Sequence, residues 1–248
     1  MKGNDNSETL YKEAIKKNAE LEKTLMVAEE PSYMLDDEYE SETNPKDSFR
    51  VLDGDKVVGD KTLADYLALP DDARVELIDG VFYDMSAPSG AHQTIAGKLF
   101  PMFDNFIEEN HGPCLPYYEY DVQLDRDDKT IVRPDIFVAC HREQIHDERF
   151  YGAPDLVVEI VSPSNWKTDV KKKREKYEAA GVREYWMIFP KEQKVTVCDF
   201  EGKTPDVDYT FHDKIPVKIW GGKCVIDFEK ILTRLEYAMG GNKVKFNE

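Results

Sequence analysis

Residues 131–190 constrain the fold of this chain more than any other stretch. They read as an apolar strand, a polar connection, a second apolar strand, a basic helix and a third apolar strand. Asp135 lies in the first strand, directly after Pro134, and Glu159 lies in the second, within DLVVEIV. Because helices interrupt the strands here and elsewhere, we expect an α/β (α+β) fold with a mixed β-sheet core flanked by helices.

The two carboxylates in apolar strands need a physical explanation. A buried charge is costly unless it is paired or binds a cation. Oxygen ligands of this kind suit a hard divalent ion such as Mg²⁺. Lys173, in the helix that follows Glu159, would then stabilise the extra negative charge of a phosphoryl transition state. The leading hypothesis from these residues is a magnesium-dependent nuclease.

The helix predicted over KTDVKKKREKYEAAG places Asp169, Lys173 and Tyr177 four residues apart. A step of four residues drifts by only ~40° around a helix, so the three side chains share one face. The apolar residues of the helix indicate that part of it is covered, which would turn Lys173 toward the carboxylates. The alternative is a solvated face on which Lys173 pairs with Asp169 across one turn.

Other interpretations stay open for the remaining candidates. Asp135 is also compatible with a strand-end carboxylate in a turn, and Glu159 with the outward residue of an edge strand. Glu76 lies in a strand before a DG hairpin signal, and strand alternation would allow it to face solvent. His92 lies in the first turn of a predicted amphipathic helix, where an imidazole is more often a surface group than a catalyst.

Composition limits the function classes. The chain has 248 residues, 41% of them hydrophobic, enough for one full-sized domain plus extensions or for two small domains. Its net charge of −17 excludes a general nucleic-acid coat protein, because phosphate would be repelled by most of the surface. A nuclease would have to place positive charge locally and neutralise its acidic centre with metal ions.

The cysteines and the apolar runs predict a compartment. Cys114, Cys140, Cys198 and Cys224 are widely spaced and form no CxxC pair, which predicts reduced, partly buried thiols in a cytoplasmic protein. No apolar run approaches the ~20 residues of a membrane span. The N-terminal MKGNDNSETL lacks the apolar core of a signal peptide, so we expect no membrane partner.

The chain divides into three predicted parts. Residues 1–59 are expected to be an acidic extension that is partly helical, over 8–29, or disordered. This extension either binds a protein partner or inhibits the domain, or it is a tail without catalytic consequence. The compact domain is expected over residues 60–240, and residues 241–248 are expected to be a C-terminal tail.

Several short motifs together resemble the Uma-two family of endonucleases, within the PD-(D/E)xK restriction-endonuclease-like superfamily. The matching pieces are YLALP at 66–70, ELIDG at 76–80, His92-Gln93, RPD at 133–135, EIVSPSN at 159–165, Asp169, Lys173, Tyr177, GV at 181–182 and EYW at 184–186. The resemblance covers about residues 60–238, and the order and spacing of the pieces make it specific. The superfamily's lysine normally occupies the position of Val161, so the resemblance implies that Lys173 supplies it from the next helix.

The resemblance implies a restriction-endonuclease-like fold and hydrolysis of phosphodiester bonds in DNA. Asp135, Glu159, the main-chain carbonyl of Ile160 and Glu76 would bind Mg²⁺, for which Mn²⁺ would substitute. Asp135, Glu159 and Glu76 would act in catalysis together with Lys173, which would orient the attacking water or stabilise the phosphorane-like charge.

Substrate contacts and partners follow from the same resemblance. His92, Lys172 and Arg174 are the candidates for contact with DNA. A homodimer is expected, because cutting two strands with one site per chain requires two chains. Two alternatives stay open: a catalytically inactive nuclease-fold module that binds a protein or nucleic acid, which Val161 and the acidic surface favour, and a metal-dependent hydrolase of another phosphoester.

Overall fold

The computed structural model describes residues 50–53, 56–70, 72–124, 128–162 and 168–238. The helix predicted over residues 8–29, the acidic segment after it and the tail at 241–248 lie outside these ranges. Among the described helices, none is both long and apolar enough to cross a membrane.

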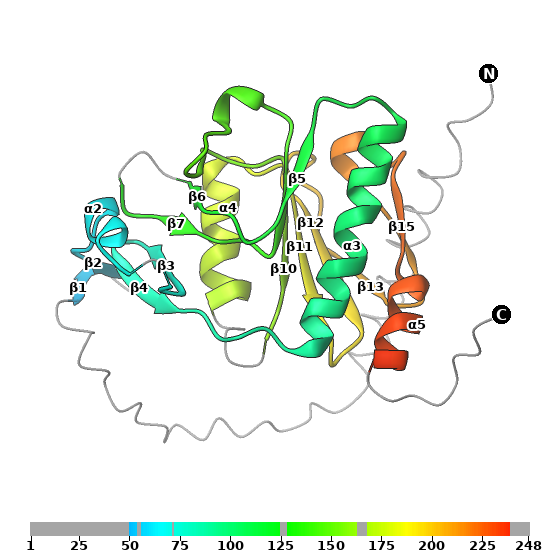
Figure 1. Ribbon diagram of the computed structural model, residues 1–248, viewed down its shortest axis with the longest axis horizontal. Helices are drawn as coiled ribbons and strands as arrows, with labels where there is room; N and C mark the ends of the chain where they lie inside the picture. Colours follow the sequence, from blue (N-terminus) through cyan, green and yellow to red (C-terminus); the bar gives the residue numbers. More distant parts are fainter. Residues whose placement is uncertain (1–49, 54–55, 71, 125–127, 163–167, 239–248) are drawn as a thin grey trace.

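The larger sheet has six strands in the order β13-β12-β11-β10-β8-β5 (Figure 1). Its strands are β5 (Leu115–Tyr117), β8 (Ile136–Ala139), β10 (Leu156–Ile160), β11 (Glu184–Phe189), β12 (Lys194–Asp199) and β13 (Val207–Thr210). Strands β10 and β11 run parallel, and the other neighbouring pairs in this sheet are antiparallel. The predicted mixed sheet is therefore confirmed.

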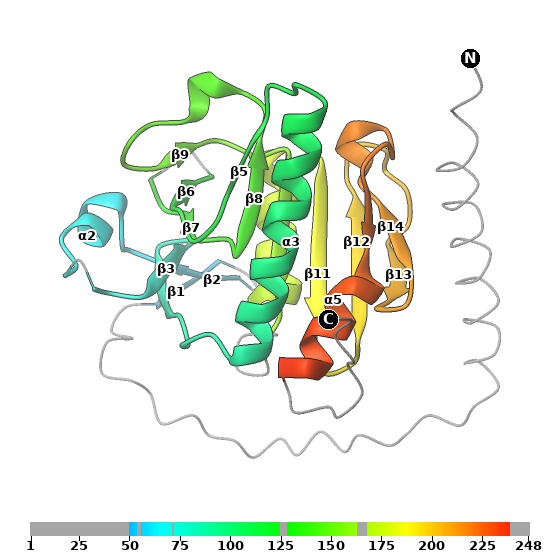
Figure 2. The ribbon, with the colours of Figure 1, turned by 45° about the vertical axis from the view of Figure 1, so that its right-hand side comes forward.

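Helices cover both faces of this sheet (Figures 1 and 2). They are α3 (Gly90–Glu109) and α5 (Phe228–Ala238) on one face and α4 (Arg174–Ala180) on the other. Consecutive residues of β10 supply the two cores: Val158 packs with Trp186 on the side of α3, and Val157 packs with Tyr177 on the side of α4. This division follows from the alternation of side chains along a strand.

Helix α3 forms where its apolar periodicity predicts it. Its buried residues are Ile95, Leu99, Phe103 and Ile107, which share one face at a spacing of four. Ser89 caps the helix, because its hydroxyl accepts a hydrogen bond from the main-chain N–H of His92. The helix continues through Pro101.

A second, five-stranded sheet has the order β4-β3-β7-β6-β9. Its strands are β3 (Val75–Ile78), β4 (Val81–Asp84), β6 (Val122–Gln123), β7 (Ile131–Val132) and β9 (Phe150–Tyr151). Asp79 and Gly80 form the predicted turn of the β3–β4 hairpin, with φ angles of 51° and 73°. Both positions need positive φ, which explains the DG pair.

Two continuous segments of the chain are each divided between the two sheets. LPYYEYDVQLD supplies β5 to the larger sheet and β6 to the smaller one, and Glu119 between them has a φ of 45°. IVRPDIFVA supplies β7 and β8 in the same way. The break lies at Pro134, which has no N–H to donate to a sheet. Asp135 therefore stands where the chain crosses from one sheet to the other.

Short elements complete the described part. They are the β1–β2 hairpin (Arg50–Asp53 and Lys56–Gly59), α2 (Leu63–Leu67), η1 (Arg142–Gln144), the π-helical η2 (Thr168–Lys173), η3 (Lys218–Trp220), and the paired strands β14 (Lys214–Pro216) and β15 (Val225–Asp227). The β1–β2 hairpin falls within the residues expected to be an extension. The N–H of Gly59 donates to the Asp79 carbonyl at 2.7 Å, which ties this hairpin to the β3–β4 turn.

The prediction of four reduced thiols is wrong for Cys114 and Cys140, which form a disulfide. Leu115 pairs with Ala139 across antiparallel β5 and β8, so the two cysteines lie side by side at the next register position. The sequence spacing does not reveal this register. Cys198 and Cys224 are free and buried, and burial raises the pKa of each thiol to about 12.

Candidate active site

A cavity of about 560 Å³ lies at the carboxyl ends of the parallel strands β10 and β11. Its wall also includes the loop before α3, the first turn of α3 and the start of β3. Its charged lining residues are Arg74, Glu76, Glu119, Arg133, Asp135, Glu159, Lys173 and Lys191. Residues that are far apart in the sequence thus meet around one space.

Lys173 connects two carboxylates at this cavity. Its Nζ lies 2.8 Å from Glu76 Oε1 and 3.1 Å from Glu159 Oε1. All three side chains are at most 5% exposed. Tyr177, one turn further along the helix, donates its hydroxyl to Glu159 Oε1 at 2.6 Å. Lys173 and Tyr177 thus share the predicted helix face, whereas the side chain of Asp169 lies outside the described part.

Main-chain and hydroxyl donors offset part of the cost of burying these acids. The N–H of Arg133 donates to Glu76 Oε1 at 2.7 Å. Burial, followed by the negative charges of Glu159 and Glu76, raises the pKa of Tyr177 well above its ordinary value. The Tyr177 hydroxyl therefore keeps its proton and stays a hydrogen-bond donor to Glu159.

Asp135 lies beside Glu159 because of the strand register. Val158 of β10 pairs with Ile136 of β8, which brings the residue before β8 to the end of β10. Asp135 Oδ2 accepts a hydrogen bond from the Ile160 N–H at 2.6 Å. Strand β10 lies between β8 and β11, so the edge-strand interpretation of Glu159 does not hold.

His92 contacts the other oxygen of Asp135. Its Nε2 lies 2.9 Å from Asp135 Oδ1, and the two side chains are 14% and 15% exposed. The second ring nitrogen, Nδ1, is buried and has no hydrogen-bond partner among the described residues. The capping turn at the start of α3 positions this imidazole beside Asp135, so the surface-group interpretation does not hold, while its contact with DNA stays a prediction.

The oxygen donors at this cavity are of the kind that a divalent cation accepts. Within the described ranges, no group of three or more His, Cys, Asp or Glu side chains is arranged to hold a metal ion. Glu76 is engaged by Lys173 and by the Arg133 N–H. Asp135, Glu159, Ile160 and Glu76 all line this cavity, and carboxylate and main-chain carbonyl oxygens are donors that Mg²⁺ accepts.

Two of the predicted substrate contacts lie away from the cavity. Lys172 contacts the Tyr83 hydroxyl, and its Nζ lies 4.5 Å from the centre of the Tyr83 ring. Arg174 donates to both carboxylate oxygens of Asp206, at 3.1 and 3.2 Å. Neither residue lines the cavity, whereas His92 does.

Arg74 and Lys191 line the cavity and were not singled out from the sequence. Arg74 lies two residues before Glu76, so strand alternation places both side chains on the same side. The spacing of two residues from Glu76 could therefore have identified Arg74 as a residue of the site. Lys191 lies in the turn directly after β11, and the parallel pairing of β10 and β11 brings it to the same cavity as Glu159.

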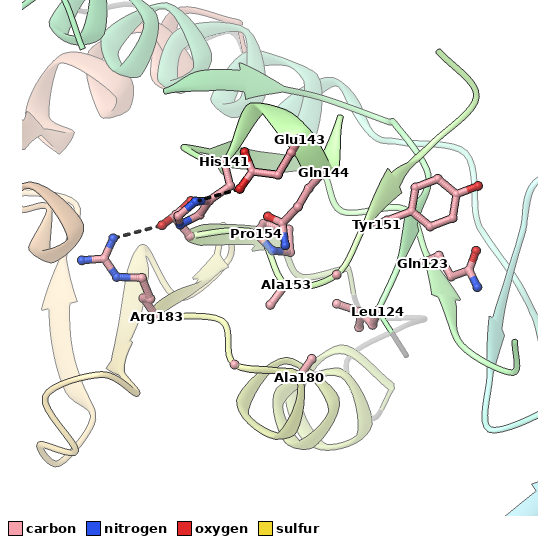
Figure 3. Close-up of a pocket in the computed structure, with 13 residues that line it drawn as sticks. Gln123, Leu124, His141, Glu143, Gln144, Tyr151, Ala153, Pro154, Ala180 and Arg183 are labelled. Carbon is pink, nitrogen blue, oxygen red and sulfur yellow. Dashed lines mark hydrogen bonds and ion pairs between the residues drawn. The ribbon is translucent and has the colours of Figure 1, made fainter. Parts of the chain in front are cut away.

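A second cavity, of about 590 Å³, lies at the opposite end of β10 and beside the end of α4 (Figure 3). Its charged side chains pair with one another: His141 with Glu143 at 3.6 Å, and Arg183 with Asp155 at 3.0 Å. None of the predicted site residues lines it. Substitutions in this second cavity therefore serve as controls for substitutions in the first.

Comparison with known proteins identifies the family of this chain. Residues 63–217 match the model of a family described as "Uma2: Putative restriction endonuclease". The chain belongs to the Uma2 family. Uma2 membership supports a nuclease-like function and agrees with the cavity at the ends of β10 and β11.

A solved structure shares the fold of this Uma2 chain. It is described as a putative nuclease belonging to DUF820 from Anabaena variabilis ATCC 29413. The two are 22% identical with a TM-score of 0.60, and the match covers 70% of this chain and 98% of the other. At that identity the match shows the fold alone. No curated protein matches the chain.

Proposed function

We propose that this Uma2 protein is a magnesium-dependent endonuclease that hydrolyses phosphodiester bonds in DNA. The observation that carries the proposal is the meeting of Asp135, Glu159 and Lys173 around one cavity. These residues come from a strand crossover, a central strand and a helix. An ion pair of Lys173 and Glu159 that only stabilised the fold would not require Asp135 and His92 to line the same cavity.

Each residue has a role in the proposed chemistry. Asp135, Glu159 and the Ile160 carbonyl would hold the ion, which when bound would polarise the phosphate and activate a water. Lys173 presents its ammonium to the negative charge that develops on the phosphoryl group. Glu76 fixes Lys173 beside Glu159, because its Oε1 is 2.8 Å from the lysine Nζ.

Val161 stands where the superfamily normally has its lysine, and Lys173 supplies a lysine beside Glu159 instead. The helix delivers a lysine to Glu159 although the strand does not, and the Nζ–Oε1 distance is 3.1 Å. This geometry favours an active nuclease over a nuclease-fold module without catalysis. Cutting both DNA strands with one cavity per chain would use a homodimer.

Nicking of supercoiled plasmid DNA tests the proposal. Wild type is expected to nick with Mg²⁺ or Mn²⁺ and to stop in EDTA. Asp135→Asn and Glu159→Gln are expected to lower the rate by roughly 10²–10³-fold, because each removes a proposed ligand of the ion that stabilises transition-state charge. Glu143→Gln, a carboxylate of the second cavity, is the matched control and should match wild type.

The other outcomes separate the alternatives. Equal nicking by wild type and both site variants would remove the nuclease claim for this cavity. DNA binding without nicking in any protein would support a binding module. Hydrolysis of bis-p-nitrophenyl phosphate without action on DNA would indicate a hydrolase of another phosphoester.

A further inference from the structure

The charged side chains around the Uma2 cavity differ in their exposure to solvent. Glu76, Glu159 and Lys173 are at most 5% exposed. Arg74 and Glu119 also line the cavity but are 39% and 37% exposed. Arg74 and Lys191 are thus exposed basic side chains at a cavity whose buried groups are mostly acids, an arrangement that fits a polyanion bound across a metal-binding centre.

Arg74 is placed by the same strand as the acid below it. It precedes β3, and its carbonyl accepts a hydrogen bond from the Met85 N–H at 2.8 Å, which extends the β3–β4 ladder to this position. Side chains two residues apart on a strand point the same way. Arg74 and Glu76 therefore both line the cavity, and Arg74 is the more exposed of the two.

Lys191 reaches the cavity from the other sheet. It is exposed and follows β11, whose end is held beside the end of β10 by the hydrogen bond from the Val161 N–H to the Ile188 carbonyl, at 2.8 Å. Arg74 and Lys191 thus approach the mouth from different sheets. A chain of phosphates that crosses the cavity would meet both.

Glu119 already pairs with Arg74. Its Oε1 lies 3.5 Å from Arg74 Nη2. Glu119 has a φ of 45°, which few residues other than glycine adopt. A carboxylate held there is an internal substitute for a phosphate, because both present oxygen acceptors to a guanidinium.

We propose that Arg74 and Lys191 bind the DNA phosphates that flank the cleaved one, and that Glu119 occupies Arg74 until a phosphate displaces it. This inference rests on the proposed endonuclease function. It assigns the positive charge that so acidic a chain needs for DNA to two residues at the cavity mouth. It also makes Glu119 a residue that weakens DNA binding.

Steady-state nicking kinetics at several salt concentrations test the assignment. Arg74→Gln and Lys191→Gln should each raise KM about tenfold at low salt, because each removes a charged hydrogen-bond donor to phosphate. Each should also lower the dependence of log KM on log salt by about 0.9. The kcat should change by less than about threefold, since the buried acids and Lys173 are untouched.

Glu119→Gln makes the test specific, because the proposal predicts the opposite sign. It should lower KM by a few-fold, since the anion that competes with DNA for Arg74 is gone. Arg142→Gln and Lys230→Gln remove exposed charges that do not line the cavity and should leave KM unchanged.

The failures are distinguishable. If wild type nicks DNA but Glu119→Gln raises KM as Arg74→Gln does, the pair is only structural and the inference is wrong. If Arg74→Gln and Lys191→Gln behave like the two controls, the inference is also wrong, while the endonuclease function stands. If wild type does not nick DNA at all, the proposed function fails and the inference fails with it.

Discussion

Lys173 Nζ lies 2.8 Å from Glu76 Oε1, and both side chains are at most 5% exposed. Glu76 comes from the smaller sheet, whereas Lys173 comes from the helical segment that lies against the larger sheet. The same ammonium contacts Glu159 of the larger sheet. One buried lysine therefore joins the two sheets electrostatically at the site of the proposed chemistry.

Removal of this lysine should destabilise the fold. Lys173→Met leaves Glu76 and Glu159 buried without their cation, and we expect the free energy of unfolding to fall by about 3–5 kcal/mol at pH 7. Urea denaturation measures the loss. Lys172→Met is the matched control, because its contact is with the Tyr83 ring, and should lose about 1 kcal/mol. Equal losses would contradict the buried ion cluster.

Loss of the His92 imidazole should weaken the proposed cation site. His92→Ala removes the group 2.9 Å from Asp135 Oδ1, so the carboxylate loses its orientation. We expect nicking to require roughly 10–100-fold more Mg²⁺, the usual effect of losing a partner of a metal ligand. Gln93→Ala, an exposed neighbour on the same helix, should leave the Mg²⁺ requirement unchanged. An unchanged requirement in His92→Ala would contradict this role.

Glu184 gives the fold a specific pH dependence. Burial raises its pKa to about 7, although the Trp186 Nε1–H and the N–H groups of Ile219 and Lys218 donate to it. The folded state therefore keeps a proton that the unfolded chain releases near pH 4.5. This contribution to stability is fully present below pH 4.5 and is lost as pH rises through 7.

Urea denaturation of wild type and Glu184→Gln at several pH values between 4.5 and 7 measures this contribution. The advantage of wild type should shrink by about 3 kcal/mol between pH 4.5 and pH 7. A gap that stays constant or widens as pH rises would show that the carboxylate is ionised throughout.

The Cys114–Cys140 disulfide should stabilise the larger sheet. The bond closes a loop with a sequence separation of 26 residues, so its removal should lower the free energy of unfolding by about 3 kcal/mol. Thermal unfolding with and without a reductant measures the change. A Cys114→Ser, Cys140→Ser double variant should melt lower and ignore the reductant. A reductant effect that persists there would assign it to Cys198 or Cys224.

The sequence predicted local features well. The apolar period of α3, the DG turn at Asp79 and the strand around Glu159 all form where their patterns place them. These features depend on residues near one another in the chain. The spacing of Lys173 and Tyr177 placed both on one helix face, but it left open whether that face meets the carboxylates or solvent.

The sequence did not predict what depends on strand pairing. The division of IVRPDIFVA between two sheets, the disulfide and the approach of Lys191 to the cavity all follow from register and strand order. Local patterns do not encode these. The pairing of Arg174 with Asp206 was not predicted either, because the sequence of a basic helix does not show which acid lies beside it in the fold.

The most direct test of the central claim is a calorimetric titration of the full chain with Mn²⁺, which measures binding without any cleavage. Wild type should bind the ion, Asp135→Asn and Glu159→Gln should bind it at least tenfold more weakly, and Glu143→Gln should match wild type. Equal Mn²⁺ affinity in all four proteins, or none in wild type, would contradict a divalent-cation site formed by Asp135 and Glu159.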